Sequence, residues 1–205
     1  MKKINNIRAK LFLFIFLIII LTIISLGIYS TNNLNNTLYQ EKEKQTREMV
    51  EIGLGVLKRF HKLEEKGELT KKEAQQRALS VIENMTFGPD NQDYFWVNNY
   101  EPKMLMHPYS TDLIGKTIGN IQDENGKYIF RDMVDIVEKK GSGFVEYYWQ
   151  YYDQDNRVEP KLSYVSGFEP WNWIVGTGVY INDVKASYIN LRNRFIMMGI
   201  AILAV

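Results

Sequence analysis

Six side chains in the middle of the 205-residue sequence could together bind a small organic acid. They supply a cation, an imidazole, hydroxyl groups and aromatic rings, and they are Tyr94, Trp96, His107, Tyr147, Trp149 and Lys161. A carboxylate needs a cation or imidazolium, one or two hydroxyl donors and apolar walls that exclude water. Each residue also has an ordinary structural interpretation: the aromatic rings could be plain core, and Lys161 could lie at a solvated strand end.

The same sequence offers little to an enzyme or a metal site. His61 and His107 are the two histidines, there is no cysteine, and no G-x-S-x-G motif occurs, so no hydrolytic triad is recognisable. The lack of cysteine also removes disulfides and thiolate zinc sites. Gly141-Ser142-Gly143 and Gly176-Thr177-Gly178 lack the frame of a phosphate-binding loop. We therefore expect no catalysis, no cofactor and no bound metal.

An apolar run near the start of the chain predicts a membrane anchor. Residues 11–28 contain no charged side chain, and as a helix these 18 residues would span roughly 27 Å, close to the hydrocarbon thickness of a bilayer. A cleaved signal peptide and a buried soluble helix are the alternatives, but signal-peptide cores are shorter and the residues after the run form a poor cleavage site. We assign residues 11–29 to a transmembrane helix. The basic residues 1–10 then lie in the cytoplasm.

A second uncharged apolar run occupies residues 195–205. It is too short to cross a bilayer, so we expect the start of a second, truncated transmembrane helix. The alternative is a hydrophobic helix packed on a soluble core. With both runs in the cell membrane, the protein is multi-pass and residues 31–190 form an extracytoplasmic domain. This domain is mildly acidic, so nucleic acid is not an expected partner.

Four segments of this domain have the apolar spacing or the end signals of helices. Apolar spacing predicts a long amphipathic helix over residues 32–63, in which His61 would be exposed or half-buried. The capping box Thr70-x-x-Glu73 begins a second helix, which we expect to end at Gly88-Pro89-Asp90. A third helix is predicted over residues 129–138, and a last one from Ile181 towards the second apolar run.

Between these helices the residues favour antiparallel strands and therefore an α+β domain. The expected strands cover residues 94–97, 104–107, 143–150, 161–168 and 173–180. Turns are expected at residues 98–102 and 153–159. Because alternate side chains of a strand share a face, Tyr94 pairs with Trp96 and Tyr147 with Trp149. Trp171, Trp173 and Tyr180 are expected to serve packing.

Several motifs follow one another along residues 32–183. They are Tyr94-Phe95-Trp96-Val97, His107-Pro108, Leu113-Ile114-Gly115-Lys116, Asp123-x-x-Gly126, Gly141-x-Gly143-Phe144-Val145-x-Tyr147-x-Trp149, Pro160-Lys161-x-x-Tyr164, and Trp171-x-Trp173-x-Val175-Gly176-x-Gly178-Val179-Tyr180-x-x-Asp183. As an ordered set they resemble a single Cache domain of type 2, the sensor region of bacterial methyl-accepting chemotaxis proteins. One departure is the first hairpin, which turns on Asn98-Asn99-Tyr100-Glu101-Pro102 where the family has Asp and Gly.

The resemblance implies a PAS-like fold, flanked by transmembrane helices, in which a long N-terminal helix packs on an antiparallel sheet and a small-molecule pocket lies on the other face. It implies an extracytoplasmic sensor of a short carboxylate in a chemotaxis receptor that signals to cytoplasmic partners, and we expect that receptor to act as a homodimer. A sensor histidine kinase, a cyclic-dinucleotide enzyme and a tethered solute-binding module are alternatives, because the sensor looks the same in each. The residues do not identify the ligand.

Overall fold

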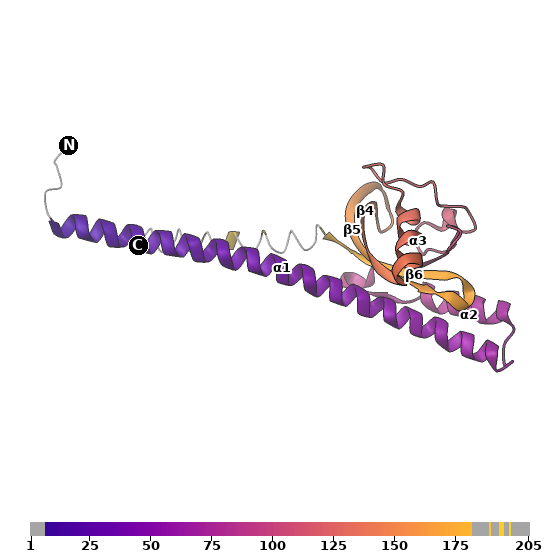
Figure 1. The fold of residues 1–205 in the computed structure, drawn as a ribbon. Coiled ribbons are helices and arrows are strands. Elements are labelled where there is room, and N and C mark those ends of the chain that lie inside the picture. Colours follow the sequence, from indigo (N-terminus) through magenta and orange to yellow (C-terminus); the bar gives the residue numbers. More distant parts are fainter. Residues whose placement is uncertain (1–6, 182–188, 190–192, 195–196, 198–205) are drawn as a thin grey trace. The chain divides into compact units, whose positions relative to one another are not determined.

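The computed structural model describes residues 7–181, 189, 193–194 and 197. The chain divides into two compact units, Met1–Gln40 with Asp183–Val205, and Glu41–Asn182. Helix α1, Ile7–Glu65, carries residues of both units (Figure 1). No helix within the described part of the chain is long and apolar enough to cross a membrane. The side chains at positions 17, 20, 21, 23, 24 and 28 of the first apolar run, and nearly all of residues 182–205, lie outside the described residues.

The unit Glu41–Asn182 is built on one antiparallel sheet with the strand order β1-β2-β6-β5-β4, and β3 pairs with β2. The strands are β1 Thr86–Phe87, β2 Asp93–Asn99, β3 Met104–Met106, β4 Ser142–Tyr151, β5 Gln154–Phe168 and β6 Trp173–Tyr180. The helices of this unit are the second half of α1, α2 Lys71–Glu83 and α3 Ile129–Lys140, with short 3-10 turns at Pro89–Asn91, Thr111–Leu113 and Glu169–Trp171. The expected α+β fold, with a long helix on an antiparallel sheet, is confirmed.

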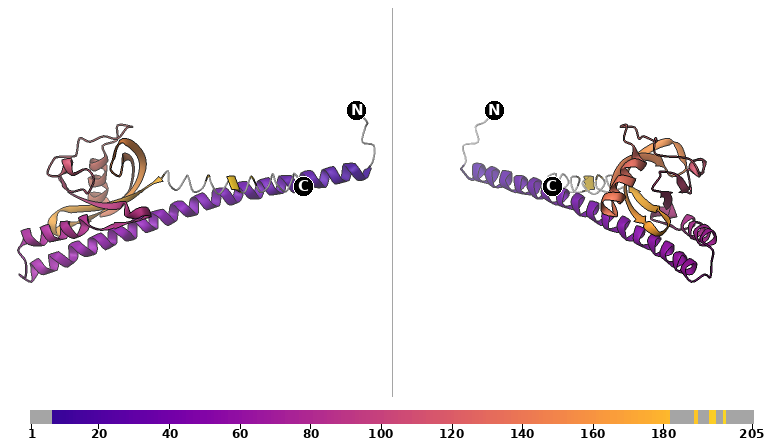
Figure 2. Two further views of the ribbon diagram at one scale, coloured as in Figure 1. Left: turned by 180° about the vertical axis from the view of Figure 1, so that it is seen from behind. Right: turned by 45° about the vertical axis from the view of Figure 1, so that its right-hand side comes forward.

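Both faces of the sheet are buried, and β2 shows how the sequence divides between them. Tyr94 and Trp96 belong to a cluster with α3, whereas Phe95 and Val97 belong to a second cluster with α1 and α2. This is the alternation expected of a strand. Helices α1 and α2 lie side by side in every view (Figures 1 and 2). The aromatic face, which packs against α3 and could bind a ligand, is therefore opposite the face that packs against α1 and α2. We call the latter the helical face.

Helix α2 begins as its sequence predicts but ends earlier. The Thr70 side chain accepts a hydrogen bond from Glu73 N at 3.3 Å, and Thr70 N donates to Glu73 Oε2 at 2.9 Å, which completes the capping box. The predicted end at residues 88–90 is wrong, because the helix stops at Glu83 with Asn84 as its cap. The next residues form β1, which pairs with β2.

Two predicted turns are also corrected. Asn98 and Asn99 continue β2, and the Asn99 side chain closes the shortened turn by accepting from Lys103 N at 2.9 Å. The turn expected at residues 153–159 is confined to Tyr152 and Asp153, because Tyr152 adopts a left-handed conformation that reverses the chain at once. The polar residues after it are extended in β5 rather than looped.

Gly53 marks the place where α1 approaches the sheet. A Cβ atom there would lie 3.2 Å from Val175 Cγ2 and 3.4 Å from Phe95 Cε1, whereas one at the exposed Gly55 would touch nothing within 4 Å. The missing side chain at Gly53 therefore sets how closely α1 packs on β2 and β6.

We expect Gly53→Leu to lower the free energy of unfolding of the full chain by about 1–3 kcal/mol, because it overpacks this contact. Gly55→Leu is the control and should leave stability unchanged or raise it by up to about 1 kcal/mol, because glycine is a poor helix former. Urea titrations in detergent solution measure both. Equal effects of the two substitutions would contradict the close approach at Gly53.

Candidate ligand-binding site

Lys161 lies at the centre of the aromatic face. It is on β5, directly opposite Tyr147 of β4 and Tyr180 of β6. Its side chain is fully buried, and Nζ has no hydrogen-bond partner among the described residues. Nζ lies 3.8 Å from the ring centroid of Tyr94, 4.9 Å from that of Tyr180 and 5.6 Å from that of Trp96. The alternative of a solvated strand end is therefore wrong, and Lys161 is a cation enclosed by π systems.

Burial lowers the pKa of Lys161 to about 7, and the charge of Asp93 partly opposes this shift. Asp93 is itself buried, and its Oδ1 accepts a hydrogen bond from the Tyr152 hydroxyl at 2.9 Å. Among the described residues, Lys161 is the one lysine or arginine that is buried. The cluster of aromatic side chains around Lys161 thus holds a single amine, and small changes of pH near 7 decide whether this amine is protonated.

His107 contributes an uncharged ring. Its Nδ1 accepts backbone hydrogen bonds from Ser110 N at 2.8 Å and Tyr109 N at 3.3 Å, so the ring proton of the neutral form is on Nε2. Burial lowers the pKa of His107 to about 3, and the charge of Lys161 acts in the same direction. The sequence left open whether a lysine cation or an imidazolium would attract the carboxylate. Because His107 is neutral near pH 7, Lys161 is the group that can carry the positive charge. His107 can serve as an N–H donor.

The aromatic residues close the cluster. The ring centroids of Tyr94 and His107 are 4.9 Å apart, those of His107 and Trp149 are 6.0 Å apart, and those of Trp149 and Tyr147 are 6.1 Å apart. The Tyr147 hydroxyl lies 3.1 Å from Ser163 Oγ. The fold therefore brings all six predicted site residues together. Whether they bind a ligand stays a prediction.

Two glycines make room for these side chains. Gly176 and Gly178 of β6 lie opposite Trp96 and beside Ser163, respectively, and a Cβ at either position would overlap the indole of Trp96 or the Ser163 side chain. The Gly176-Thr177-Gly178 motif, which has no phosphate-binding frame, is explained by this close approach.

The sequence reasoning missed four members of the cluster: Asp93, Tyr152, Ser163 and Tyr180. Strand alternation could have found two of them, because Ser163 is two residues after Lys161 and Tyr180 two after Gly178. Tyr180 was expected to serve packing alone, yet its hydroxyl accepts from Tyr152 N at 3.3 Å and donates to Gln150 O. Asp93 and Tyr152 lie at a strand start and in a turn, where alternation gives no signal.

A family model for Single Cache domain 2 matches residues 38–192, which is most of the chain. The chain belongs to the single Cache domain 2 family. The chain is 36% identical over 199 residues to the methyl-accepting chemotaxis protein McpP of Pseudomonas putida, and the match covers 96% of this chain and 36% of that protein. It is 25% identical over 157 residues to the sensor histidine kinase MctS of Rhizobium johnstonii, covering 77% of this chain and 32% of that protein. The chain spans about a third of the length of these curated relatives.

Solved structures agree with this assignment. A Cache chemosensory domain described for its carboxylic acid recognition is 38% identical, with a TM-score of 0.67 over 71% of this chain and 97% of that one. A periplasmic sensor domain of a chemotaxis protein is 35% identical, with a TM-score of 0.66 over 70% of this chain and 97% of that one. The Cache domain described here is thus a sensor domain of the type found in chemotaxis receptors.

The lowered pKa of Lys161 predicts how stability depends on pH. The unfolded chain binds this proton up to about pH 10.5, the folded chain only up to about 7, so the unfolded state holds more protons between these values. Stability of the ligand-free protein should therefore rise from pH 7 to 8.5, with a slope of at most about 1.4 kcal/mol per pH unit. The buried tyrosines Tyr94, Tyr147 and Tyr180, whose pKa is raised, oppose this rise only closer to pH 10. His107 titrates below this window.

The measurement is urea unfolding of the full chain at several pH values. Lys161→Met should remove the slope and be more stable than the wild type at pH 7, because it removes a buried ammonium without a partner. Lys139→Met, at an exposed position of α3, is the matched control. A wild-type stability that is flat over this window would contradict the lowered pKa, because it would show that Lys161 keeps its proton in the folded state as it does in the unfolded state.

Proposed function

We propose that this domain senses a carboxylate of two to four carbons and that the anion binds next to Lys161. The observation that carries the proposal is the fully buried ammonium without a hydrogen-bond partner. Leaving a cation unpaired in the interior is costly, and a carboxylate supplies both the charge and the acceptors that it lacks. The solved neighbour described for carboxylic acid recognition supports the same ligand class.

The other side chains then have separate roles. His107 Nε2 and the Tyr147 hydroxyl are candidate donors to the carboxylate, while Tyr94, Trp96 and Trp149 form walls around its carbon chain. Asp93 repels a second negative charge, and no second buried lysine or arginine occurs among the described residues. A monocarboxylate therefore fits better than a dicarboxylate.

We infer that the sensor lies outside the cytoplasm and reports across the membrane. The support is the basic leader, the uncharged run over residues 11–28, the apolar residues 195–205, and the solved relative that is a periplasmic sensor domain. The proposed receptor is a membrane-anchored homodimer that acts on cytoplasmic signalling partners and performs no catalysis itself. McpP favours a chemotaxis output, and MctS keeps a histidine kinase as the second candidate.

Thermal unfolding of the full chain in detergent tests the ligand. Acetate, propionate, butyrate and pyruvate should be screened at 100 mM and pH 6.5. A binding acid present at 100 times its Kd stabilises the protein by about 2.7 kcal/mol, which raises the melting temperature by several degrees. Lys161→Met should abolish this shift, because the anion loses its cation, whereas Lys139→Met should retain it.

Two results would contradict the proposed ligand. One is a screen in which amines or neutral solutes stabilise the wild type and carboxylates do not. The other is a carboxylate shift of equal size in the wild type and in Lys161→Met, which would place the anion elsewhere.

Protease accessibility tests the topology. Proteinase K added to intact cells should cut within residues 31–194 and spare an N-terminal epitope tag, because the positive leader holds residues 1–10 inside. Permeabilised cells, in which the tag is also lost, are the control. Protection of residues 31–194 in intact cells would overturn the proposed orientation.

A further inference from the structure

The centre of the candidate ligand site is closed to solvent, whereas Trp149 at its edge is half-buried. Lys161 is completely buried, and Tyr94, Trp96 and His107 are each at most 2% exposed. A small acid can reach Lys161 only if part of the surrounding wall moves. The strands that form this wall differ in how many neighbours hold them in the sheet.

Most of the wall is fixed by backbone ladders on both sides. Strand β6 pairs with β2 and β5, and β5 pairs with β4 and β6. Strand β4, which carries Tyr147 and Trp149, is different because it lies at the edge of the sheet and pairs with β5 alone. Its free edge is a place where the wall can open without breaking a central ladder.

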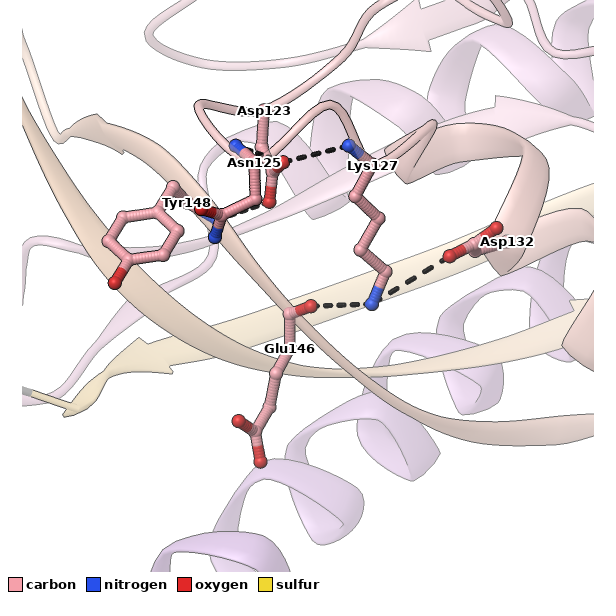
Figure 3. A network of polar contacts seen from close by, with 6 residues as sticks. All are labelled: Asp123, Asn125, Lys127, Asp132, Glu146 and Tyr148. Atoms are coloured by element: carbon pink, nitrogen blue, oxygen red, sulfur yellow. Dashed lines mark hydrogen bonds and ion pairs between the residues drawn. The ribbon is translucent and has the colours of Figure 1, made fainter.

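Side chains of one loop cover that free edge (Figure 3). We call residues 121–128 the strap. Asp123 Oδ1 accepts from Asn125 N and Lys127 N, each at 2.9 Å, and Asp123 Oδ2 accepts from Tyr148 N of β4 at 3.2 Å. Asp123 thus closes a turn within the strap and also attaches the strap to Tyr148, which lies between Tyr147 and Trp149 on β4.

Lys127 makes the second attachment. Its Nζ donates to Glu146 O of β4 at 2.6 Å and lies 3.7 Å from Asp132 Oδ2 of α3. The attachment borders an open cleft of about 330 Å³ between α3 and β4. Both contacts to β4 therefore reach the main chain of the edge strand, and both are made by charged side chains.

The strap itself is only lightly embedded. Five of its eight residues are exposed and none is buried, whereas Ile118 before it and Ile129 after it are fully buried. Although partial burial raises the pKa of the Asp123 carboxyl, hydrogen bonds from Lys127, Tyr148 and Asn125 hold it below its ordinary value. The Asp123 carboxylate is thus charged at neutral pH. The strap is anchored by buried residues before and after it, and between them polar side chains attach it to β4.

We propose that the strap is a releasable gate, and that its attachment to Tyr148 and Glu146 sets the rate at which ligand enters and leaves the site. This inference rests on the proposed function. Release of the Asp123 and Lys127 contacts frees the edge of β4 next to Tyr147 and Trp149. Re-attachment closes the wall over the bound anion.

A gate of this kind has a kinetic signature. The strap contacts no member of the ligand cluster through its charged groups, so weakening it destabilises the closed state equally with and without ligand. Both the association and the dissociation rate constants then rise by the same factor, and their ratio, the Kd, is unchanged. Loss of a direct ligand contact would instead raise the dissociation rate alone.

Stopped-flow tryptophan fluorescence of the full chain in detergent can measure these rates, because Trp96 and Trp149 line the site. The probe is whichever of acetate and propionate binds the wild type more tightly. Asp123→Asn should raise both rate constants about tenfold and change Kd less than about twofold, since a charge-assisted hydrogen bond is lost. Asp135→Asn is the matched control: it removes an exposed ion pair to Lys139 on α3 and should alter neither rate.

Unchanged rates in Asp123→Asn would overturn the gate, and so would a change confined to dissociation. Hydrogen exchange of the ligand-free protein gives a second test that does not need a carboxylate. Lys127→Met removes the bond to Glu146 O and the ion pair to Asp132 but leaves the Asp123 contacts in place. It should nevertheless accelerate exchange of the amides of Asn125 and Tyr148 about tenfold if the strap opens as one unit.

In the wild type, these two amides should also exchange faster than the amides of β6. Exchange at the rate of β6, unaffected by Lys127→Met, would show that the strap opens only with the whole domain. A wild type that binds neither acid would count against the proposed function, while the exchange result would still decide the gate.

Discussion

The structure depends on one costly arrangement, an ammonium group buried without a hydrogen-bond partner. Lys161 is tolerated because aromatic faces surround Nζ and because Asp93 supplies a counter-charge from the start of β2. The neighbouring groups follow from it. His107 must be neutral beside a cation, which the backbone donors at Nδ1 allow. The hydroxyls of Tyr147, Tyr152 and Tyr180 already have partners, which are the Ser163 hydroxyl, the Asp93 carboxylate and the main-chain carbonyl of Gln150.

The sheet connects this polar cluster with the helical face. Trp96 packs on Gly176 on one side of the sheet, and the next residues, Phe95 and Val175, meet α1 at Gly53 on the other. Only the sheet therefore separates the space around Lys161 from α1, the helix that continues into the N-terminal unit. Because both faces are close-packed, a shift of β2 or β6 on the ligand side has to be accommodated on the helical side.

Much of this arrangement could be predicted from the sequence, since it follows from strand alternation. The pairs Tyr94 with Trp96 and Tyr147 with Trp149 share a face as expected, and the capping box at Thr70 begins α2. Properties set by tertiary contacts could not be predicted. The charge state of His107 depends on its burial and on the charge of Lys161, and its tautomer depends on two backbone N–H groups that follow it. Asp93 enters the cluster where no periodic pattern exists. The early reversal at Tyr152 needs a left-handed tyrosine, which sequence preferences disfavour.

The near-neutral pKa of Lys161, about 7, has a consequence for what such a receptor measures. Under the proposed function, an anion that pairs with this amine would stabilise its protonated form, so above pH 7 each carboxylate would be taken up together with one proton. Uptake of an anion plus a proton is thermodynamically the same as uptake of the undissociated acid. In alkaline surroundings the receptor would then report the activity of the free acid, the species that crosses lipid bilayers unaided, rather than the total amount of its salt.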